Sequence, residues 1–486
     1  MKRESFGSRL GFILVSAGCA IGLGNVWKFP YICGAYGGAA FILIYLAFLV
    51  ILGIPVLTCE FAVGRGSRKS VAKSFEELAP EGTAWVHLKY IGIVGCHLLM
   101  MFYTMVGGWM MYYCYRSIRG EFVKASAEEI GEAFSGMLTD VPVMVFWTVL
   151  VCVLGFAVCA LGLQKGIERI TKVMMSVLFV IMIVLSVHSV MMPGAAEGVR
   201  FYLVPDFRKM VENGIGNVVF AALGQAFFTL SIGIGAMLIF GSYLDKSRSL
   251  AGEAVSITAL DTFVALMAGF IVIPSCFSYG IEPGAGPSLV FITLPNIFAQ
   301  MAGGSVWSFL FFLFLTFAAL STIIAVFENL IACYMEMFGW SRRKSVLVCA
   351  VAVILLSMPC VLGFNMLSGI QPLGEGTTIM DLEDFIVSNN LLPLGSLGYV
   401  LFCTRKNGWG WDAFIGEVNT GTGMKFPTAL KSYVSYGIPA IIIVIYLKGY
   451  YDMFKGQSTA MLAGWLIVAV AFLAFVLGCA FRKEKQ

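Results

Sequence analysis

The sequence predicts an all-α polytopic membrane protein with twelve transmembrane helices, the first and sixth of them broken. Of the 486 residues, 59% are hydrophobic and 12% are charged, whereas a soluble globular chain carries about 25% charged residues. The apolar runs recur at lengths near the ~20 residues that cross a bilayer. Two of these runs, at residues 16–34 and 224–243, carry glycines at positions that would lie in the middle of the membrane.

Twelve apolar runs give the order of the predicted helices. Their ranges are 9–34, 37–64, 87–118, 142–163, 168–191, 214–243, 250–279, 304–338, 345–364, 377–403, 428–448 and 459–481. The segment 280–303 contains a further apolar run of about 10 residues, too short to span a bilayer, which predicts a re-entrant or capping hairpin. Residues 404–427 are predicted to form a comparable loop on the cytoplasmic side.

The distribution of basic residues predicts the orientation of these helices. An even number of spans places both termini on one side of the membrane. With the termini in the cytoplasm, about 23 Lys and Arg residues face inside and about 8 face outside, and the opposite orientation inverts that ratio. We therefore expect a multi-pass protein of the inner (plasma) membrane with both termini in the cytoplasm.

The first apolar run is unsuited to a helix that only spans lipid. Within SAGCAIGLGNVWKFPYICG (16–34), Gly18, Gly22 and Gly24 precede Pro30, and relative to alanine a glycine costs a helix interior about 1 kcal/mol and a proline about 3 kcal/mol. Irregular backbone survives at membrane depth only where it is buried in protein or lines a cavity. Gly18 and Gly22 also fit the GxxxG pattern of plain helix packing, which stays open as the alternative.

A second interrupted run favours the broken-helix interpretation. Gly233 and Gly235 fall in the middle of the membrane beside Thr229 and Ser231. Glycine-broken helices at equivalent places in two halves indicate a transporter built from inverted repeats, with its site between the halves. The predicted division is a first repeat over 1–191, an outer loop over 192–213, a second repeat over 214–403 that includes the hairpin 280–303, and a cytoplasmic loop with the last two helices over 404–486.

Other classes of function are disfavoured by what the sequence lacks. The thirteen cysteines lie mostly in apolar runs, without a CxxC pair or a Cys/His cluster of metal-ligand spacing, and are interpreted as small buried hydrophobes. The net charge of +4 is spread over short loops and predicts no nucleic-acid partner. Because no HExxH motif, pair of catalytic carboxylates or activated nucleophile is present, we do not expect an enzyme.

Five sequence motifs resemble those of the neurotransmitter:sodium symporter family, of the LeuT type. They are RESFGSRLGFIL at 3–14, GLGNVWKFPYICGAYGG at 22–38, EFAVGR at 60–65, GQAFFTLSIGIG at 224–235 and FITLPNIFAQ at 291–300. The resemblance extends from residue 3 to the end of the tenth predicted helix and continues more weakly beyond it. Since the long, disulfide-bearing second outer loop of animal members is absent, the chain is similar to bacterial representatives. The resemblance implies a fold in which helices 1–5 and 6–10 are inverted repeats.

The resemblance implies two sodium sites made of oxygen ligands, which suit a hard cation. The first site matches the Ala20 carbonyl, the side chains of Asn25, Thr229 and Asp261, and the substrate carboxylate. The second site matches the carbonyls of Gly18, Ile21 and Ala318 and the hydroxyls of Ser321 and Thr322. A serine or threonine in a helix more often bonds the carbonyl four residues before it, and this alternative stays open for Ser321.

The resemblance also implies an amino-acid substrate between the two sodium sites. Family members bind the substrate carboxylate at backbone N–H groups matching Leu23 and Gly24 and at a tyrosine hydroxyl matching Tyr103. The full set of matching substrate positions is Ala20, Leu23, Gly24, Leu99, Tyr103, Phe228, Thr229, Ser231, Ile234, Ser321 and Val326. Because most of these are apolar and none is charged, a neutral, hydrophobic or aromatic amino acid is expected.

Asp261 is where the sequence departs from the family pattern, since relatives usually have asparagine at this position. A carboxylate near the middle of the membrane costs at least ~2.5–3.5 kcal/mol on insertion scales and needs a partner. Animal relatives balance the charge with chloride bound near a serine of helix seven, which is Ala265 here. We expect Asp261 to supply the missing negative charge, with no chloride requirement and with a proton that exchanges when sodium leaves. A structural carboxylate paired within the bundle is the alternative.

Two charged pairs are implied as gates on either side of the substrate. The outer pair matches Lys28 and Asp384, with Phe228 as a hydrophobic lid, and the inner pair matches Arg3 and Glu336. Lysine is a point charge without the bidentate fork of arginine, so the outer pair is expected to be looser than in relatives with arginine. Hydrated ion pairs contribute about 0–1 kcal/mol, which suits a gate that must open.

Together these features predict a sodium-coupled symporter that imports a neutral amino acid by alternating access. Its expected partners are the amino acid, two sodium ions and the lipid bilayer, and its oligomeric state is left open. A substrate-gated channel or an amino-acid sensor on the same scaffold is the alternative. Burial of the site between two gates argues against an open pore, and flux that saturates and requires sodium would distinguish the transporter.

Overall fold

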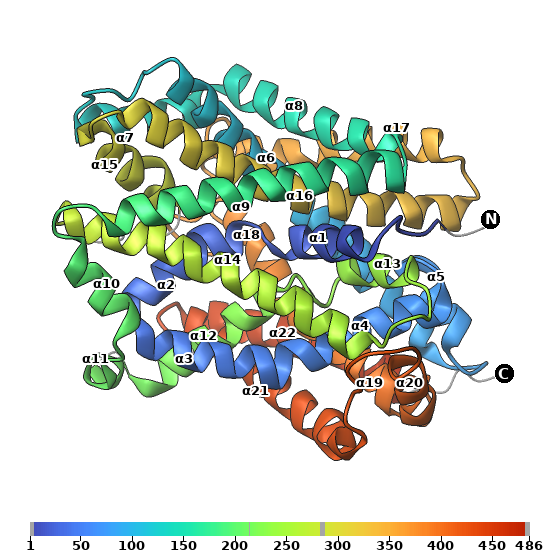
Figure 1. Cartoon of the computed structure of the whole chain (residues 1–486). Helices are drawn as coiled ribbons and strands as arrows, with labels where there is room; N and C mark the ends of the chain where they lie inside the picture. Colours follow the sequence, from blue (N-terminus) through green and yellow to red (C-terminus); the bar gives the residue numbers. More distant parts are fainter. Residues whose placement is uncertain (1–3, 213, 282–286, 482–486) are drawn as a thin grey trace.

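The computed structural model describes residues 4–212, 214–281 and 287–481, and this part of the chain is almost wholly helical (Figure 1). The first half contains α1 (Arg9–Ala20), α2 (Phe29–Ala35), α3 (Ala39–Phe48), α4 (Ile54–Ser67), α5 (Val71–Leu78), α6 (Lys89–Ile118), α7 (Ala127–Thr139), α8 (Val141–Ala160), α9 (Arg169–Val190), α10 (Ala195–Leu203) and α11 (Phe207–Glu212). The second half contains α12 (Ile215–Thr229), α13 (Ala236–Ser242), α14 (Leu250–Ser278), α15 (Leu294–Gln300), α16 (Gly304–Phe338), α17 (Arg342–Leu362), α18 (Ile379–Ile386), α19 (Leu392–Thr404), α20 (Trp411–Val418), α21 (Ile438–Phe454) and α22 (Thr459–Phe481).

These helices form the twelve predicted spans, with small shifts at the ends. Within the described ranges, ten helical segments are long and apolar enough to cross a membrane, and α1 with the segment Gly24–Ala35 makes an eleventh that bends by 58°. Helices α12 and α13 are each too short to cross alone and together make the twelfth. Several spans run through a π-helical turn, such as Leu49–Gly53 between α3 and α4 and Val387–Leu391 between α18 and α19.

The predicted loops contain short helices. Helix α15 follows a π-helical turn within the predicted hairpin 280–303, and α10 and α11 lie in the predicted outer loop 192–213. Tyr202 on α10 donates a hydrogen bond to the carbonyl of Leu266 on α14 at 2.8 Å, which fixes this loop on the bundle. The predicted loop 404–427 holds α20.

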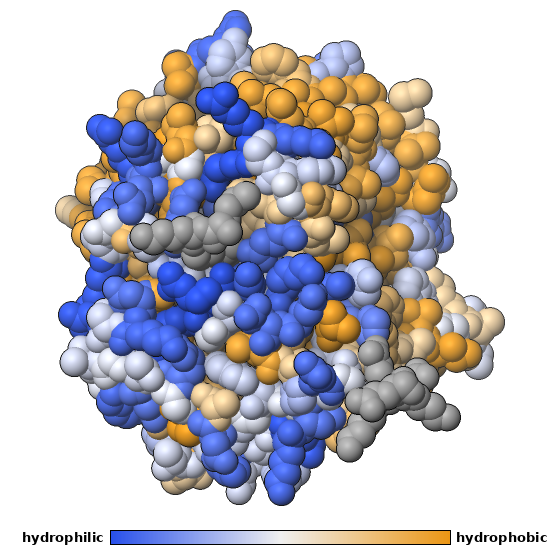
Figure 2. Space-filling view, turned by 90° about the vertical axis from the view of Figure 1, so that its right-hand side faces the viewer, coloured by the Kyte–Doolittle hydropathy of each residue, from blue (hydrophilic) through white to orange (hydrophobic). Residues whose placement is uncertain are grey.

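The start of α1 and the end of α22 lie at the same end of the bundle. Glu4 contacts Arg342 at the start of α17, and the Asn407 amide donates to the carbonyl of Ala480 near the end of α22. Helices α5 and α20 also lie at this end (Figure 1). In the face-on view of this end, hydrophilic residues cover most of the surface and hydrophobic residues gather toward the rim (Figure 2). This distribution suits one aqueous end of a membrane-spanning bundle.

The first helix breaks at residues 21–23. Ile21 at the end of α1 has extended backbone, with φ −68° and ψ 100°, so the helical hydrogen-bond series stops there. A Cβ atom added to Gly22 would lie 2.0 Å from the Tyr103 hydroxyl, and one added to Gly18 would lie 3.1 Å from a side chain of α16. Gly22 therefore makes room for Tyr103 at the break, as the broken-helix interpretation requires. Gly18 allows close packing against α16, as the GxxxG interpretation requires.

The sixth helix breaks at residues 230–235, where a buried carboxylate replaces helical hydrogen-bond acceptors. Glu60 on α4 is fully buried and accepts hydrogen bonds from the N–H groups of Gly233 (2.8 Å), Met237 (3.1 Å) and Leu238 (3.3 Å). The first N–H groups of a helix have no partner within that helix, and they favour a negative charge. Glu60 thereby stabilises the unwound segment.

Gly233→Ala should destabilise the fold. Gly233 has φ +104°, and an added Cβ would lie 2.2 Å from the backbone oxygen of Leu392. Left-handed backbone costs a non-glycine residue about 1–2 kcal/mol before this overlap is counted, so we expect a lower melting temperature in detergent. Gly224→Ala on α12 is the matched control because nothing lies within 4 Å of its added Cβ. Equal melting temperatures for the two variants would contradict this account of the break.

Candidate functional site

The two broken helices meet α14 at a cluster of three fully buried polar side chains, Asn25, Thr229 and Asp261. The Asn25 amide nitrogen donates to Asp261 Oδ1 at 2.8 Å and to Thr229 Oγ1 at 3.0 Å. Thr229 Oγ1 in turn donates to Asp261 Oδ2 at 2.8 Å. The structure thus brings together the three side chains predicted for the first sodium site, and Ala20 lines the cavity beside them.

The chemistry of this first cluster fits a small, hard cation. Its possible ligands are hydroxyl and carboxylate oxygens, the type that hard cations prefer, together with the Asn25 amide oxygen, which here accepts a hydrogen bond from the Gly22 N–H at 3.1 Å. Within the described ranges Asp261 forms no ion pair with a lysine or arginine, and it accepts hydrogen bonds from neutral groups of Asn25 and Thr229. A buried charge needs an opposite charge or hydrogen bonds, and a bound sodium ion would supply the opposite charge.

A second group of oxygens lies where the end of α1 meets α16. The Thr322 hydroxyl oxygen is 3.2 Å from the carbonyl oxygens of Gly18, Cys19 and Ile21, and 3.4 Å from that of Ala318. One hydroxyl hydrogen cannot satisfy four carbonyls at once, so this oxygen cluster also suits a cation. The structure places four of the five residues predicted for the second sodium site around one point and adds Cys19.

Ser321, the fifth residue predicted for that site, is hydrogen-bonded within its own helix. Its hydroxyl donates to the carbonyl of Ala318 at 2.9 Å, and the residue is buried. This local bond is of the kind that the sequence left open as the alternative. Because the accepting carbonyl is itself a predicted ligand, Ser321 still lies next to the oxygen cluster, and its ligation of sodium stays a prediction.

A small cavity adjoins both oxygen clusters. Its lining comprises Ala20, Gly22, Leu23, Gly24, Leu99, Tyr103, Phe228, Ser231, Thr322 and Leu392. The Leu23 N–H donates to the Tyr103 hydroxyl at 3.0 Å, so two of the groups predicted to hold the substrate carboxylate face each other. None of the lining side chains carries a charge, and five of them are large and apolar or aromatic.

The remaining predicted pocket residues lie elsewhere. Thr229 belongs to the first oxygen cluster. Ile234, Ser321 and Val326 are buried but do not line the cavity. Ile234 packs against α6, where a Cβ added to Gly95 would lie 2.6 Å from its Cγ2. Contact of these side chains with a substrate stays a prediction.

Three residues contribute to the site in ways that were not predicted from the sequence. Cys19 offers a backbone carbonyl, which every residue has, so its residue type carries no signal. Leu392 is an apolar residue in an apolar helix far along the chain, and only the fold places it in the cavity. Gly22 was recognised as part of the break, but its closeness to Tyr103 depends on the packing of α6.

A cavity of about 250 Å³ is lined by Phe228 and by both residues predicted for the outer gate, Lys28 and Asp384. The Lys28 ammonium lies 4.0 Å from the centroid of the Phe228 ring, and Asp384 accepts a hydrogen bond from Ser388 at 2.6 Å. In this part of the described chain the two gate residues form no ion pair with each other. Their pairing in a closed state stays a prediction.

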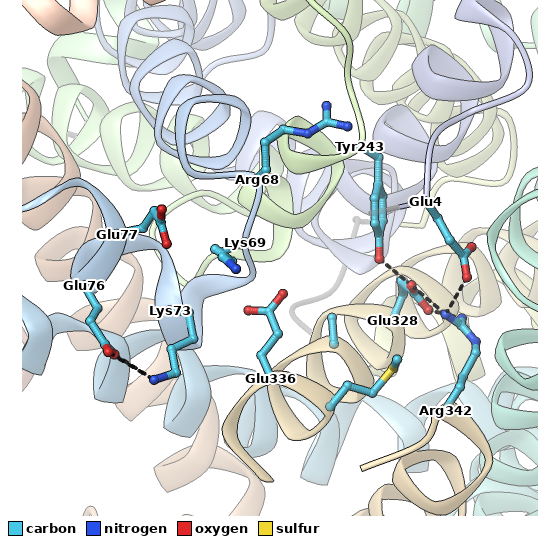
Figure 3. A pocket seen from close by; sticks show the side chains of 12 residues that line it. Glu4, Arg68, Lys69, Lys73, Glu76, Glu77, Tyr243, Glu328, Glu336 and Arg342 are labelled. Atoms are coloured by element: carbon cyan, nitrogen blue, oxygen red, sulfur yellow. Dashed lines mark hydrogen bonds and ion pairs between the residues drawn. The ribbon is translucent and has the colours of Figure 1, made fainter. Parts of the chain in front are cut away.

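A larger cavity, of about 560 Å³, lies at the end of the bundle that holds the start of α1 (Figure 3). Arg342 forms an ion pair with the fully buried Glu328, and its Nη1 lies 3.6 Å from Glu4. The Tyr243 hydroxyl also donates to Glu328. Glu328, a membrane-embedded carboxylate for which the sequence suggests no partner, is therefore compensated by Arg342.

Of the predicted inner gate pair, only Glu336 lies within the described residues. Arg3 lies outside the described residues. Glu336 projects toward the same cavity (Figure 3) and accepts hydrogen bonds from the N–H of Ser70 at 2.9 Å and from its hydroxyl at 2.7 Å. Glu336 thus connects α16 to the start of α5, and its pairing with Arg3 stays a prediction.

Comparisons with known sequences agree with this geometry. The sequence profile described as "Sodium:neurotransmitter symporter family" matches residues 3–132 and 120–477. The sodium-dependent transporter YhdH of Bacillus subtilis (strain 168) is 35% identical over 450 residues, covering 92% of this chain and 98% of the relative. The sodium- and chloride-dependent GABA transporter 2 of Mus musculus is 26% identical over 501 residues, covering 92% of this chain and 80% of the relative.

A solved structure supports the same assignment. The crystal structure of MhsT in complex with L-phenylalanine superposes with a TM-score of 0.82 at 37% identity, covering 92% of this chain and 99% of that one. The likeness confirms the LeuT-type fold with its broken first and sixth helices. The chain is a multi-pass membrane protein, and it belongs to the sodium:neurotransmitter symporter family, whose members are sodium-dependent transporters and not enzymes.

Proposed function

We propose that this protein imports a neutral amino acid with a hydrophobic or aromatic side chain, together with two sodium ions and without chloride. The observation that carries the proposal is the uncharged cavity adjoining two groups of buried oxygens. Leu99, Phe228 and Leu392 offer apolar surface to a substrate side chain. MhsT, which has the same fold, was solved in complex with L-phenylalanine.

The substrate carboxylate is proposed to lie at the first break. The N–H groups of Leu23 and Gly24 and the hydroxyl of Tyr103 are donors at the cavity wall. Backbone N–H groups at the start of a helical segment favour an anion. The carboxylate would replace the present contact between Leu23 and Tyr103 and would also complete the ligand shell of sodium at Asn25, Thr229 and Asp261.

On this proposal, a shared ligand, the substrate carboxylate, couples sodium transport to amino-acid transport. If the carboxylate is a sodium ligand, sodium raises the affinity for the amino acid, and the amino acid raises the affinity for sodium by the same factor. Each sodium ion that enters down a 100 mV potential releases about 2.3 kcal/mol. Two ions therefore support steep accumulation of the amino acid.

Asp261 is proposed to make chloride unnecessary. Its carboxylate is a fixed negative charge at the first sodium site. Ala265, one helical turn further along α14, is fully buried and has no polar group for an anion. On this proposal, the proton that neutralises Asp261 after sodium leaves would be exchanged during each cycle.

The proposed orientation places both termini in the cytoplasm, with Lys28 and Asp384 toward the outside and Glu336 toward the inside. The positive-inside rule supports it. A channel or sensor on the same scaffold is the competing function. Uptake of radiolabelled amino acids into proteoliposomes, with and without an inward sodium gradient, tests the proposal. Saturable, sodium-dependent accumulation supports it, and flux that neither saturates nor needs sodium contradicts it.

Asp261→Asn should lower the affinity for sodium while leaving the shape of the site intact. Asparagine keeps an oxygen ligand but removes the negative charge opposite the sodium ion. A loss of about 1.5–3 kcal/mol, the size of interactions with charged groups, should raise the sodium concentration for half-maximal uptake at least roughly 10-fold. Asp206→Asn, at an exposed position in the outer loop, is the control. In the parent protein, replacement of chloride by gluconate should leave uptake unchanged. An unaltered sodium dependence in Asp261→Ala, which removes the side-chain oxygens altogether, would refute ligation, and a strict chloride requirement would refute charge compensation.

Tyr103→Phe should reduce affinity for the amino acid. Removing one hydrogen bond to a carboxylate costs about 1.5–3 kcal/mol, which corresponds to a roughly 10- to 150-fold weaker substrate affinity in a radioligand binding assay. Tyr113→Phe on the same helix is the matched control, because the buried Tyr113 hydroxyl has no hydrogen-bond partner in the described chain. Equal affinities in the two variants would place the substrate carboxylate elsewhere.

A further inference from the structure

The chain before α1 is held on the start of the fifth span by one buried carboxylate. Glu168 ends the π-helical turn that precedes α9, and its side chain is 5% exposed. It accepts hydrogen bonds from the N–H of Gly7 at 2.7 Å, from the hydroxyl of Ser8 at 3.0 Å and from the ammonium of Lys172 at 2.6 Å. Both Glu168 oxygens are therefore bound to donors, and two of the three donors belong to the segment before α1.

The Glu168 side chain also lies directly on α1. A Cβ added to Gly11 would be 2.0 Å from Glu168 Oε1 and 2.4 Å from Cδ. Glycine in a helix interior is about 1 kcal/mol less favourable than alanine, and the close approach of the carboxylate explains its presence at this position. At Gly7 an added Cβ would lie 3.4 Å from Glu168 Oε2, which is an ordinary contact.

Further hydrogen bonds join the segment before α1 to residues on either side of Glu168. The N–H of Leu163 donates to Glu4 at 2.8 Å, and the Gln164 amide donates to the carbonyl of Ser5 at 2.8 Å. Lys172 also donates to the Ser8 hydroxyl at 2.8 Å. We call residues 4–11, together with their partners between 163 and 172, the N-terminal latch.

The other end of α1 carries the carbonyls of the second sodium site. Gly18, Cys19 and Ile21 surround the Thr322 hydroxyl. A Cβ added to Gly18 would lie 3.3 Å from both Thr171 and Met175 on α9. Helix α1 is thus fixed to α9 at its start by hydrogen bonds and near its end by close packing. Because a helix of twelve residues moves as a rigid rod, release of its start would carry the carbonyls away from Thr322.

We propose that Glu168 is a positioning residue for the second sodium site, and this inference rests on the proposed function of that site. With the N-terminal latch closed, α1 stays against α9 and α16, and the carbonyls converge on one point. Water at the cytoplasmic end can replace the three donors of Glu168, because Lys172 is 33% exposed. Opening of the latch would then both weaken sodium binding and expose the face of α9 that α1 covers.

Glu168→Gln tests the proposal, since it keeps the shape of the side chain and removes the charge. The sodium concentration for half-maximal uptake should rise roughly 10-fold, within the usual range of coupling between distant groups. The melting temperature without sodium serves as the control readout. A purely structural role for Glu168 would lower the melting temperature and leave the sodium dependence unchanged.

A second readout measures the opening itself and does not require uptake. All thirteen native cysteines are buried, so a cysteine introduced as Thr171→Cys, beneath α1, reports exposure of α9 to a maleimide. Labelling of Thr171→Cys should be slowed by sodium, and adding Glu168→Gln should accelerate it several-fold. Because this readout needs no substrate, it decides the inference even if the assigned amino acid is wrong.

Two glycine variants test the same contact with Glu168 if Glu168→Gln fails to fold. Gly11→Ala displaces the carboxylate and should reproduce both effects, although it raises intrinsic helix propensity. Gly7→Ala keeps the backbone donor and should behave as the parent protein. Unchanged sodium dependence and unchanged labelling in Gly11→Ala, or equal effects in the two glycine variants, would overturn the inference. Absence of sodium-dependent uptake in the parent protein would instead refute the proposed function.

Discussion

The structure depends on the contact between the Glu60 carboxylate and the unwound backbone of the sixth helix. An interrupted helix exposes N–H groups that cannot be left unpaired at membrane depth. Glu60 satisfies those of Gly233, Met237 and Leu238 from a neighbouring span. The charge is in turn stabilised by these N–H groups, so the unwound segment and the buried carboxylate require each other. From this unwound segment the Ser231 hydroxyl donates to the carbonyl of Cys19 at the first break, at 3.3 Å.

The glycines of the two breaks have separate physical tasks. Gly233 adopts a left-handed conformation and lies against the backbone of Leu392, whereas Gly22 makes room for the Tyr103 hydroxyl. In both places a third helix, α19 or α6, comes close to the irregular backbone and closes the cavity. The breaks therefore create the oxygen clusters and also determine which other helices can line the site.

The sequence predicted the features that leave a trace in residue type or pattern. Apolar runs gave the twelve spans, and glycines in the first and sixth runs located both breaks. Asn25, Thr229 and Asp261 could be assigned because the sequence resembles the family around both breaks and along the seventh helix, and the structure brings them together. Leu392 and the carbonyl of Cys19 could not, because one is an apolar residue in an apolar helix and the other is backbone. The partner of Glu328 was also beyond reach, since Arg342 at the start of α17 looks like an ordinary loop cation until the fold places it there.

The two ends of the site differ in how strongly they are held. At one end, Lys28 lies over the Phe228 ring and beside a cavity, without an ion pair to Asp384 among the described residues. At the end that holds the start of α1, buried carboxylates bind donors from other elements: Glu328 binds Arg342, and Glu168 binds Gly7 and Ser8. Buried charges are costly to leave unpaired, so any separation of these elements has to supply new partners for them. Water can do so because Arg342 and Lys172 are partly exposed. Among the described residues, the end that holds the start of α1 is therefore joined by more charged contacts than the end that holds Lys28 and Asp384.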